Sequence, residues 1–393
     1  MANVPRGTRR AMFPGGVSRP VVSPIQTSVV YASQDPDTLD DQYGGEADGY
    51  TYAREGHPNA DVLAGLLNAA EGATGGVVAG SGMAAVTIAV LANLRAGDHI
   101  VGADQLYGRS LRLMAEDLPR FGIATSLADP TDLNAMKAAI RPETRMILVE
   151  TTSNPTLRVA DVEGIIELAQ ARNILVVVDN TFATPRGLRP LELGADLVVH
   201  SVTKLLAGHS DATLGYVGAN DAALTERMRV LSQTMGFTPS PFDCWLAERG
   251  LYSFDLRYDK ATENARKLAD ALADLSGVRR VLYPTRPDHP DHNRAHSLLN
   301  GEGGHMVSFE IAPTRAAANA FVRAAQGIAF APTLGDIATT LSHPATSSHR
   351  GLTEDDRRAL GITEGFLRVS VGCEDTDALI DTFVKAVAAA DAA

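Results

Sequence analysis

The segment ILVVVDN (residues 174–180) decides the fold class, because it is a short run of aliphatic and β-branched residues that ends in a carboxylate. Amphipathic, helix-like segments such as DVEGIIELAQAR (161–172) separate it from further runs of the same kind. Near-continuous apolar runs that alternate with amphipathic helices indicate a mostly parallel sheet covered on both faces. The runs are GGVVAG (75–80), HIVGA (99–103), MILVET (146–151), ILVVVDN (174–180), DLVVHS (196–201) and LGYVGA (214–219).

The composition and hydrophobic periodicity of the chain change twice, which predicts three parts. Residues 1–56 are rich in Pro, Gly, Asp and Ser with little periodicity, which is typical of an extended arm with loops. Residues 57–255 hold the alternating pattern and form the predicted large domain. Residues 256–393 form a predicted smaller α/β domain that follows a long helix-like segment (254–275). Its strand candidates are VRRVLYP (278–284), HMVSFEIA (305–312) and FLRVSVG (366–372).

Composition excludes several classes of protein. The 393-residue chain has a formal net charge of −12, which argues against a nucleic-acid or anionic-membrane partner, since both need a concentrated basic face. Its two cysteines, Cys244 and Cys373, provide neither a disulfide framework nor the spacing of a metal site. Its apolar runs are too short to span a membrane. We therefore expect a cytoplasmic protein without a bound metal.

The glycine turn GSGMAA (80–85) follows the first apolar run and opens a helix. Backbone N–H groups at such a helix N-terminus are a natural seat for a phosphate. The turn also matches the dinucleotide pattern G-x-G-x-x-G/A, with Asp104 at the end of the next run as a possible ribose partner. An NAD(P)-dependent dehydrogenase is therefore one alternative.

A lysine and an aspartate end two consecutive apolar runs. Only five of the 35 basic residues are lysines, and Lys204 alone follows a run that reads as a buried strand. Asp179 ends the preceding run. A carboxylate among apolar neighbours is costly unless a cation meets it, so the two residues could form a structural ion pair. Pyridoxal phosphate also requires both groups, a lysine for the imine and an acid for the ring nitrogen. Ser201 and Thr203 would then supply hydroxyls to its phosphate.

An ordered set of motifs resembles the Cys/Met-metabolism family of pyridoxal-phosphate enzymes, which contains cystathionine γ-lyase, cystathionine γ-synthase, methionine γ-lyase and the O-acetylhomoserine sulfhydrylases. The resemblance runs over nearly the whole chain in the right order. The motifs are YAR (52–54), SGMAA (81–85), LYG (106–108), ETTSNPT (150–156), DNTFATP (179–185), HSVTKLLAGHSD (200–211) and LRVSVGCED (367–375).

This resemblance implies a fold-type-I enzyme with a covalent pyridoxal 5'-phosphate imine on Lys204, and it assigns Lys204 and Tyr107 to catalysis. It implies Asn154, Thr333 and Arg368 as the site of the substrate carboxylate. It also implies a homo-oligomer, usually a tetramer of two dimers, in which the arm completes a neighbouring subunit's site. The implied cofactor-binding set is Tyr52, Arg54, Ser81, Gly82, Met83, Tyr107, Asp179, Thr181, Ser201, Thr203 and Lys204.

Departures from the family pattern bear on specificity. Arg109 stands where the family usually has a small residue or cysteine, and Thr333 stands where it typically has serine. Arg109 could meet an anionic far end of the substrate or an anionic leaving group, or it could point into solvent. Thr333 keeps a hydroxyl and is expected to keep its role.

The expected reaction is γ-elimination on an amino acid with a γ-leaving group, as in the cystathionine and methionine lyases, which gives a 2-oxo acid and ammonia. The alternative is γ-replacement by a synthase or sulfhydrylase, with an unusual γ-leaving group possible in either case. A non-catalytic protein that only retains the cofactor is a further alternative. The motifs do not separate elimination from replacement, because both reactions share their first steps.

Overall fold

The apolar runs form a seven-stranded sheet in the computed structural model, which describes residues 21–393. The strand order is β1-β7-β6-β5-β4-β2-β3, and only β7 runs antiparallel to its neighbours, so the mostly parallel sheet is confirmed. The strand β3 was not anticipated, since its alternate residues are partly exposed and it lacks an apolar run. The strands are β1 Gly75–Ala79, β2 His99–Ala103, β3 Ala124–Ala128, β4 Thr144–Glu150, β5 Leu175–Asp179, β6 Leu197–His200 and β7 Gly215–Ala219.

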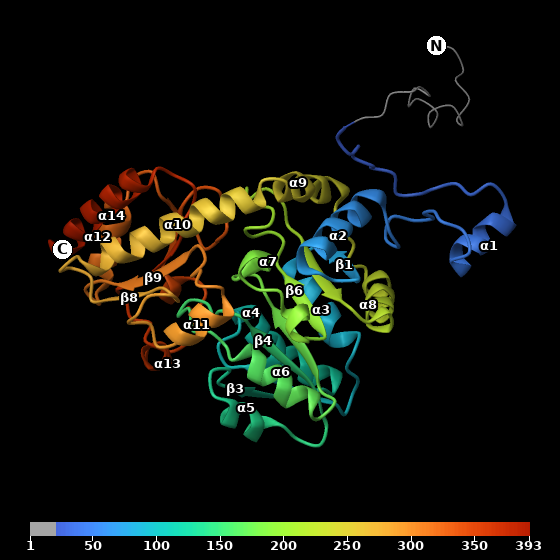
Figure 1. The fold of residues 1–393 in the computed structure, drawn as a ribbon, viewed down its shortest axis with the longest axis horizontal. Helices are drawn as coiled ribbons and strands as arrows, with labels where there is room; N and C mark the ends of the chain where they lie inside the picture. Colours follow the sequence, from blue (N-terminus) through green and yellow to red (C-terminus); the bar gives the residue numbers. More distant parts are fainter. Residues whose placement is uncertain (1–20) are drawn as a thin grey trace, which may run out of the picture.

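Helices cover both faces of this sheet (Figure 1). Along β6, Leu197 and Val199 belong to one apolar cluster and Val198 to another, so alternate side chains enter separate cores on opposite faces. The helical segments of this part are α2 Pro58–Glu71, α3 Gly82–Leu91, α4 Gly108–Arg112, η2 Leu113–Asp117, η3 Leu118–Phe121, α5 Leu133–Ala139, α6 Val162–Gln170, α7 Thr184–Gly187, η4 Pro190–Leu193, α8 Ala222–Met235 and α9 Pro241–Leu251.

Local capping determines where the first two of these helices begin. The ring nitrogen Nδ1 of His57 accepts a hydrogen bond from the Ala60 N–H (3.2 Å), and Pro58 follows as the first helical residue of α2. At α3, the Ser81 hydroxyl accepts from the Ala84 N–H (3.1 Å). This cap places Gly82 at the first position of α3, directly after β1.

A second sheet, in the order β10-β11-β12-β9-β8, lies in the C-terminal part and is reached through α10 (Phe254–Ala273), which Figure 1 shows running from α9 across to that part. Its core includes three aromatic rings, Phe309, Phe321 and Phe383, with centroids 5.3–6.3 Å apart. The smaller α/β domain with its own sheet is confirmed, and the short strands β10 and β11 were not anticipated. The elements are β8 Arg280–Leu282, α11 His292–Leu298, β9 Met306–Glu310, α12 Arg315–Ala324, β10 Ala329–Phe330, β11 Thr340–Ser342, η5 Pro344–Thr346, α13 Glu354–Ala359, β12 Phe366–Ser370 and α14 Thr376–Asp391.

Residues 21–56 extend away from both sheets (Figure 1). They contain one short helix, α1 (Pro36–Gly44), which buries no residue and was not anticipated from the sequence. The arm is held at its base, where Trp245 Nε1 donates to the Ser23 carbonyl (2.9 Å) and Asn59 Oδ1 accepts from the Gln26 N–H (2.8 Å). The rest of the arm therefore has little to pack against within one chain.

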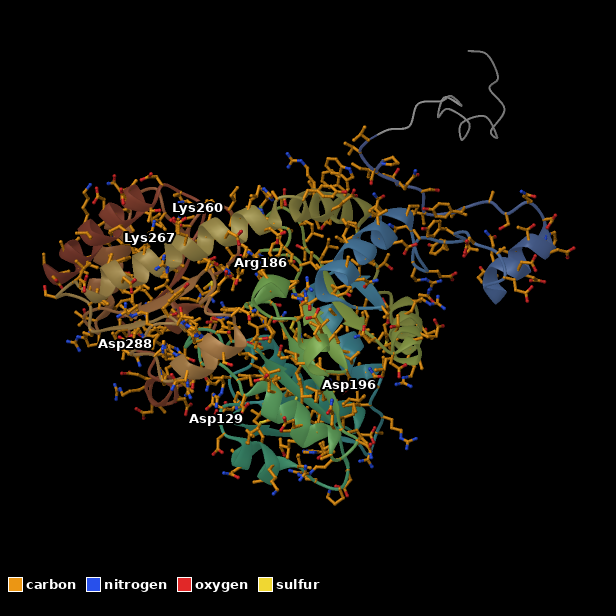
Figure 2. The ribbon with its side chains drawn as sticks, viewed as in Figure 1. Asp129, Arg186, Asp196, Lys260, Lys267 and Asp288 are labelled. Atoms are coloured by element: carbon orange, nitrogen blue, oxygen red, sulfur yellow. The ribbon has the colours of Figure 1, made fainter. Side chains whose placement is uncertain are left out.

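Ion pairs join the two sheet-containing parts. Arg186 on α7 pairs with Asp259 (2.5 Å) and Asp255 (3.6 Å) of α10, and Figure 2 labels Arg186 between these helices. Arg158 forms a two-pronged contact with the buried Asp291 (2.6 and 3.1 Å). Within residues 21–393, no helix is both long and apolar enough to cross a membrane.

A buried arginine on α10 holds the turn that follows β6. Arg257 donates to the carbonyls of Leu205 (2.7 Å), Leu206 (3.1 Å) and Gly250 (2.8 Å). Gly208 fits this arrangement in two ways, because its φ is +75° and an added Cβ would lie 1.9 Å from the guanidinium. The turn that carries Lys204 is thereby fixed to the long helix.

We expect Arg257→Leu to lower the free energy of unfolding by about 2–3 kcal/mol, because it leaves buried carbonyls without donors. Equilibrium urea unfolding followed by circular dichroism measures the loss. Lys267→Met is the matched control on the same helix, since its 2.5 Å pair with Glu263 is exposed and contributes under about 0.5 kcal/mol. Equal stability of the two variants would contradict this account of the turn.

Candidate active site

The carboxyl ends of β4, β5 and β6 meet at one edge of the large sheet. Glu150 lies beside Asp179, and Asp179 beside Val199, in the strand register. Lys204 lies in the turn that follows β6. Burial lowers the pKa of its amine, and the nearby charge of Arg368 lowers it further. The sheet therefore brings together the lysine and the aspartate that the sequence predicted.

The Asp179 carboxylate is oriented by its own turn. It accepts from the backbone N–H (3.0 Å) and the hydroxyl (2.5 Å) of Thr181, and the Thr181 oxygen in turn accepts from the Ser201 N–H (2.9 Å). Burial raises the pKa of Asp179 above its usual range, against the lowering effects of Thr181 and His200. Within the described residues, Asp179 pairs with no basic side chain and Lys204 with no acidic one, so a structural ion pair between them is not observed.

Glu150 is a site residue to which sequence reasoning assigned no role. Its buried carboxylate accepts from the Tyr107 N–H (2.5 Å), so it ties the start of α4 to the end of β4. Burial and the neighbouring charge of Asp179 raise its pKa well above the usual range. The position of Glu150 at a strand end was the only signal in the sequence.

The start of α3 approaches the turn after β6 closely. A Cβ on Gly82 would lie 2.7 Å from the Ser201 Cβ, so glycine is required for this contact. The hydroxyl of Ser81 caps the helix, and the sulfur of Met83 contacts the Ser110 hydroxyl at 3.8 Å. The first N–H groups of α3 therefore face the region of Ser201, as an anion seat requires.

The Thr203 hydroxyl is already engaged. It donates to the Leu214 carbonyl (3.1 Å) and accepts from the Leu214 N–H (2.9 Å). Because its only proton is used, donation to a phosphate would require the contact with Leu214 to open. The structure thus places Thr203 near the predicted seat but directs its hydroxyl to the start of β7.

Arg368 is buried in the middle of β12 and has no acidic partner among the described residues. It donates to Asn154 Oδ1 (2.6 Å) and to the Thr333 carbonyl (2.9 Å), while its Nε has no partner. Burial lowers its pKa to about 10. A buried guanidinium without a counter-ion is costly, so this site is suited to an anionic ligand. Thr333 takes part through its backbone oxygen rather than through the expected hydroxyl.

Tyr107 and Arg109 lie at the outer side of the site and are exposed. Tyr107 precedes α4 and is close enough to Arg368 to act on its pKa. An added Cβ on Gly108 would meet the Ser348 carbonyl at 3.1 Å, so α4 contacts the loop after η5. Arg109 belongs to no ion pair within the described residues.

Tyr52 and Arg54 do not join the Lys204 group through any hydrogen bond in the described chain. They are exposed, the Arg54 guanidinium lies 5.4 Å from the Tyr52 ring centroid, and Arg54 pairs with Glu55 at 3.6 Å. Both line a recess of about 410 Å³ together with Phe242 and the segment before α9. Of the predicted site residues, only these two belong to the arm.

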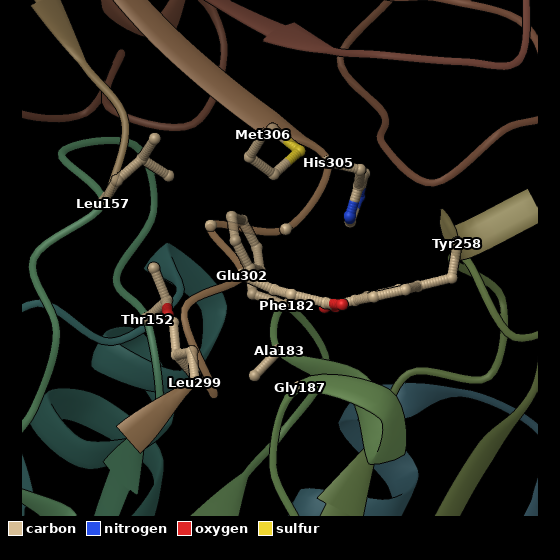
Figure 3. A pocket seen from close by; sticks show the side chains of 12 residues that line it. Thr152, Leu157, Phe182, Ala183, Gly187, Tyr258, Leu299, Glu302, His305 and Met306 are labelled. Carbon is tan, nitrogen blue, oxygen red and sulfur yellow. The ribbon is translucent and has the colours of Figure 1, made fainter. Parts of the chain in front are cut away.

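A second, much smaller cavity lies between the two sheet-containing parts. Its volume of about 10 Å³ has room for about one water molecule. Figure 3 shows Tyr258, Glu302 and His305 around it, and both ring nitrogens of His305 are buried without a partner. It is too small for a cofactor. The described residues also contain no cluster of three or more metal-ligating side chains.

The residues present fit pyridoxal phosphate. An amine with a lowered pKa, a carboxylate oriented by Thr181, and a helix N-terminus crowded against Ser201 meet at one sheet edge. They match the three functional groups of the cofactor, its aldehyde, ring nitrogen and phosphate. The unpaired Nε of Arg368 leaves a separate place for the carboxylate of an amino acid.

Comparisons with known proteins point to one family of enzymes. The family model described as "Cys/Met metabolism PLP-dependent enzyme" matches residues 13–388. Cystathionine beta-lyase MetC of Bacillus subtilis is 39% identical over 338 residues, which cover 86% of this chain and 86% of that protein. Human cystathionine gamma-lyase is 36% identical over 374 residues, or 95% of this chain and 90% of that protein.

A solved structure gives the same result. Cystathionine gamma synthase from Xanthomonas oryzae pv. oryzae, in complex with cystathionine, aligns with a TM-score of 0.89 and 35% identity, over 95% of this chain and 94% of that one. The model match and these identities, over nearly the full chain, show that the protein belongs to the Cys/Met-metabolism family of pyridoxal-phosphate-dependent enzymes.

Proposed function

We propose that the protein eliminates the γ-substituent of a cystathionine-like amino acid and forms a 2-oxo acid and ammonia. The observation that carries this proposal is the buried Arg368, free of acidic partners, close to the Lys204 amine. Relatives named as γ-lyases support the choice, since human cystathionine gamma-lyase aligns over 95% of the chain. The nicotinamide alternative leaves Lys204, Asp179 and Arg368 without a task and has no support from the comparisons.

Each residue then has a defined task. Arg368 and Asn154 bind the substrate α-carboxylate, which the unpaired guanidinium Nε is free to contact. The Gly82 and Met83 amides, with Ser81 and Ser201 beside them, hold the phosphate, and Thr203 would join them if its contact with Leu214 opens. Thr181 orients the Asp179 carboxylate, which accepts from the ring nitrogen. When bound, pyridoxal phosphate withdraws electrons from the substrate α-carbon.

Lys204 holds the cofactor through its amine in the resting enzyme and, once released by the substrate, takes the proton from the α-carbon. Its lowered pKa favours the neutral form that a base needs. Tyr107, fixed through its N–H by Glu150, faces the departing group from the start of α4. The exposed Arg109, two residues after Tyr107 in the first turn of α4, meets the far end of the substrate.

The arm is assigned to a neighbouring subunit. Tyr52 and Arg54 are exposed and form no hydrogen bond with the residues around Lys204 in the described part of their own chain, which supports their reaching the phosphate of another copy. We propose a cytoplasmic homotetramer of two dimers with shared sites, built from an arm (1–56), a cofactor-binding domain (57–255) and a small domain (256–393).

The cofactor attachment is tested by borohydride reduction of the purified holoenzyme followed by peptide mass spectrometry. We expect the reduced cofactor on Lys204 alone among the five lysines, because only this amine lies at the sheet edge. The remaining four lysines serve as internal controls, because they lie on helices α5, α10 and α14 and not in the turn after β6. They are Lys137, Lys260, Lys267 and Lys385. Modification of a different lysine, or the absence of a visible cofactor band before reduction, would refute the proposed site.

The reaction is tested by product analysis with cystathionine and no added thiol. γ-Elimination with water gives cysteine, 2-oxobutanoate and ammonia, whereas cleavage of the other carbon–sulfur bond gives homocysteine, pyruvate and ammonia. We expect 2-oxobutanoate. Pyruvate would identify a β-lyase. No reaction with cystathionine, together with consumption of homoserine esters only when cysteine is present, would identify the replacement reaction.

The role of Arg109 is tested with two substrates that differ by one carboxylate, the succinyl and acetyl esters of homoserine. We expect Arg109→Ala to lower kcat/KM for the succinyl ester about threefold to fivefold, the effect of losing one exposed charge contact of about 0.7–1 kcal/mol, and to leave the acetyl ester unaffected. Arg120→Ala is the control, since Arg120 is exposed on η3 with only a 3.8 Å pair to Asp117. Equal losses on both esters would exclude recognition of a distal anion.

A further inference from the structure

Behind the candidate site, two ionisable side chains from distant parts of the chain form a buried contact. Nε2 of His200, the last residue of β6, hydrogen-bonds Oε1 of Glu71, the last residue of α2, and both side chains are inaccessible to solvent. Asn180 joins them by donating its Nδ2 to the same Glu71 oxygen (3.0 Å). Thr151 donates to the Asn180 oxygen (2.9 Å).

This arrangement is unfavourable for stability alone. A carboxylate at the last position of α2 meets the negative end of the helix dipole. Burial of an ionisable pair also costs desolvation that an apolar pair would avoid. In addition, Oε2 of Glu71 and Nδ1 of His200 are buried without a hydrogen-bond partner among residues 21–393. A purely structural contact would be served better by neutral side chains, so the pair requires another explanation.

The pair lies one residue away from the site on every strand that it touches. His200 precedes Ser201, Asn180 follows Asp179, and Thr151 follows Glu150. No hydrogen bond links His200 to Asp179 in the described chain, yet the charge of His200 lowers the pKa of Asp179 against the effect of burial. The influence is therefore electrostatic, through a region from which water is excluded.

The ionisable groups around His200 are few. β5 provides Asp179, β7 provides Tyr216, whose ring centroid is 6.4 Å away, and α2 provides Glu71. Glu192 on η4 is exposed and pairs with Arg189 at 3.1 Å, and α3 carries no ionisable residue. Among the described residues, Glu71 is thus the only carboxylate hydrogen-bonded to His200.

We propose that Glu71 and His200 are positioning residues, because their buried contact lies behind Asp179 and favours the ionised form of that carboxylate toward the ring nitrogen of the cofactor. This inference rests on the proposed function. An ionised Asp179 keeps the ring nitrogen protonated, and the positive ring resists a second proton on the nitrogen that joins the cofactor to Lys204. The pair therefore sets both the affinity for the cofactor and the pH at which its visible absorbance changes.

The test compares the holoenzymes of His200→Gln, Glu71→Gln and the double variant with the wild type. The first readout is the midpoint of the cofactor's visible absorbance between pH 5 and 10. We expect each single variant to raise it by about one unit, because a weaker positive charge on the ring makes the second proton easier to bind. The second readout is the Kd of pyridoxal phosphate for the apoprotein, which we expect to rise about tenfold. The double variant should match His200→Gln, since the two residues act as one unit.

Tyr216→Phe is the matched control. Its hydroxyl is buried in the same region and donates to Asn68 (2.7 Å), but its removal changes no charge, so the midpoint should stay at the wild-type value. If His200→Gln fails to fold, the nearly isosteric Glu71→Gln carries the test. Unmoved midpoints in the variants, or an equal shift in Tyr216→Phe, would overturn this inference alone. A wild-type enzyme without a visible cofactor band would instead overturn the proposed function.

Discussion

Two carboxylates that end neighbouring parallel strands impose the central electrostatic constraint on this protein. Glu150 and Asp179 lie side by side in register, Glu150 is buried and Asp179 is half-buried, and no described lysine or arginine pairs with either. Two adjacent acids held out of bulk water ionise together only at a cost unless a cation lies between or beside them. The sheet edge therefore favours a ligand that brings positive charge, and a protonated pyridine ring meets this requirement.

The small domain contains a charge of the opposite sign that also lacks a partner. Among the described residues, Arg368 is a buried cation without an acidic partner, as Asp179 is a half-buried acid without a lysine or arginine partner. The two groups do not neutralise each other, because they belong to different sheets and Arg368 is held by Asn154 and the Thr333 carbonyl. A bound amino acid on the cofactor supplies one carboxylate and one cationic ring, so a single complex satisfies both sites. Ligand binding should consequently favour the observed packing of the two domains.

Sequence reasoning found the parts of the fold that rest on local patterns. ILVVVDN and its counterparts became strands because fully buried parallel strands need continuous apolar runs. The strand β3 was not predicted because its segment ATSLA is partly exposed and contains no continuous apolar run. The strand β10 was not predicted because it is only two residues long. The helix α1 was not predicted because none of its nine residues is buried, so its sequence shows no apolar periodicity.

The site was predictable in its residue types but less so in its contacts. Lys204 and Asp179 could be predicted because Asp179 ends one apolar run and Lys204 follows the next. The direction of the Thr203 hydroxyl depends on where β7 begins, and the backbone role of Thr333 depends on how its loop meets β12. The contact between Glu71 and His200 joins residues 129 positions apart, so no local pattern could reveal it. A site with several buried charges depends on such long-range pairs. The interaction energy between these charges becomes large only once the fold has excluded water, so the unfolded sequence does not reveal it.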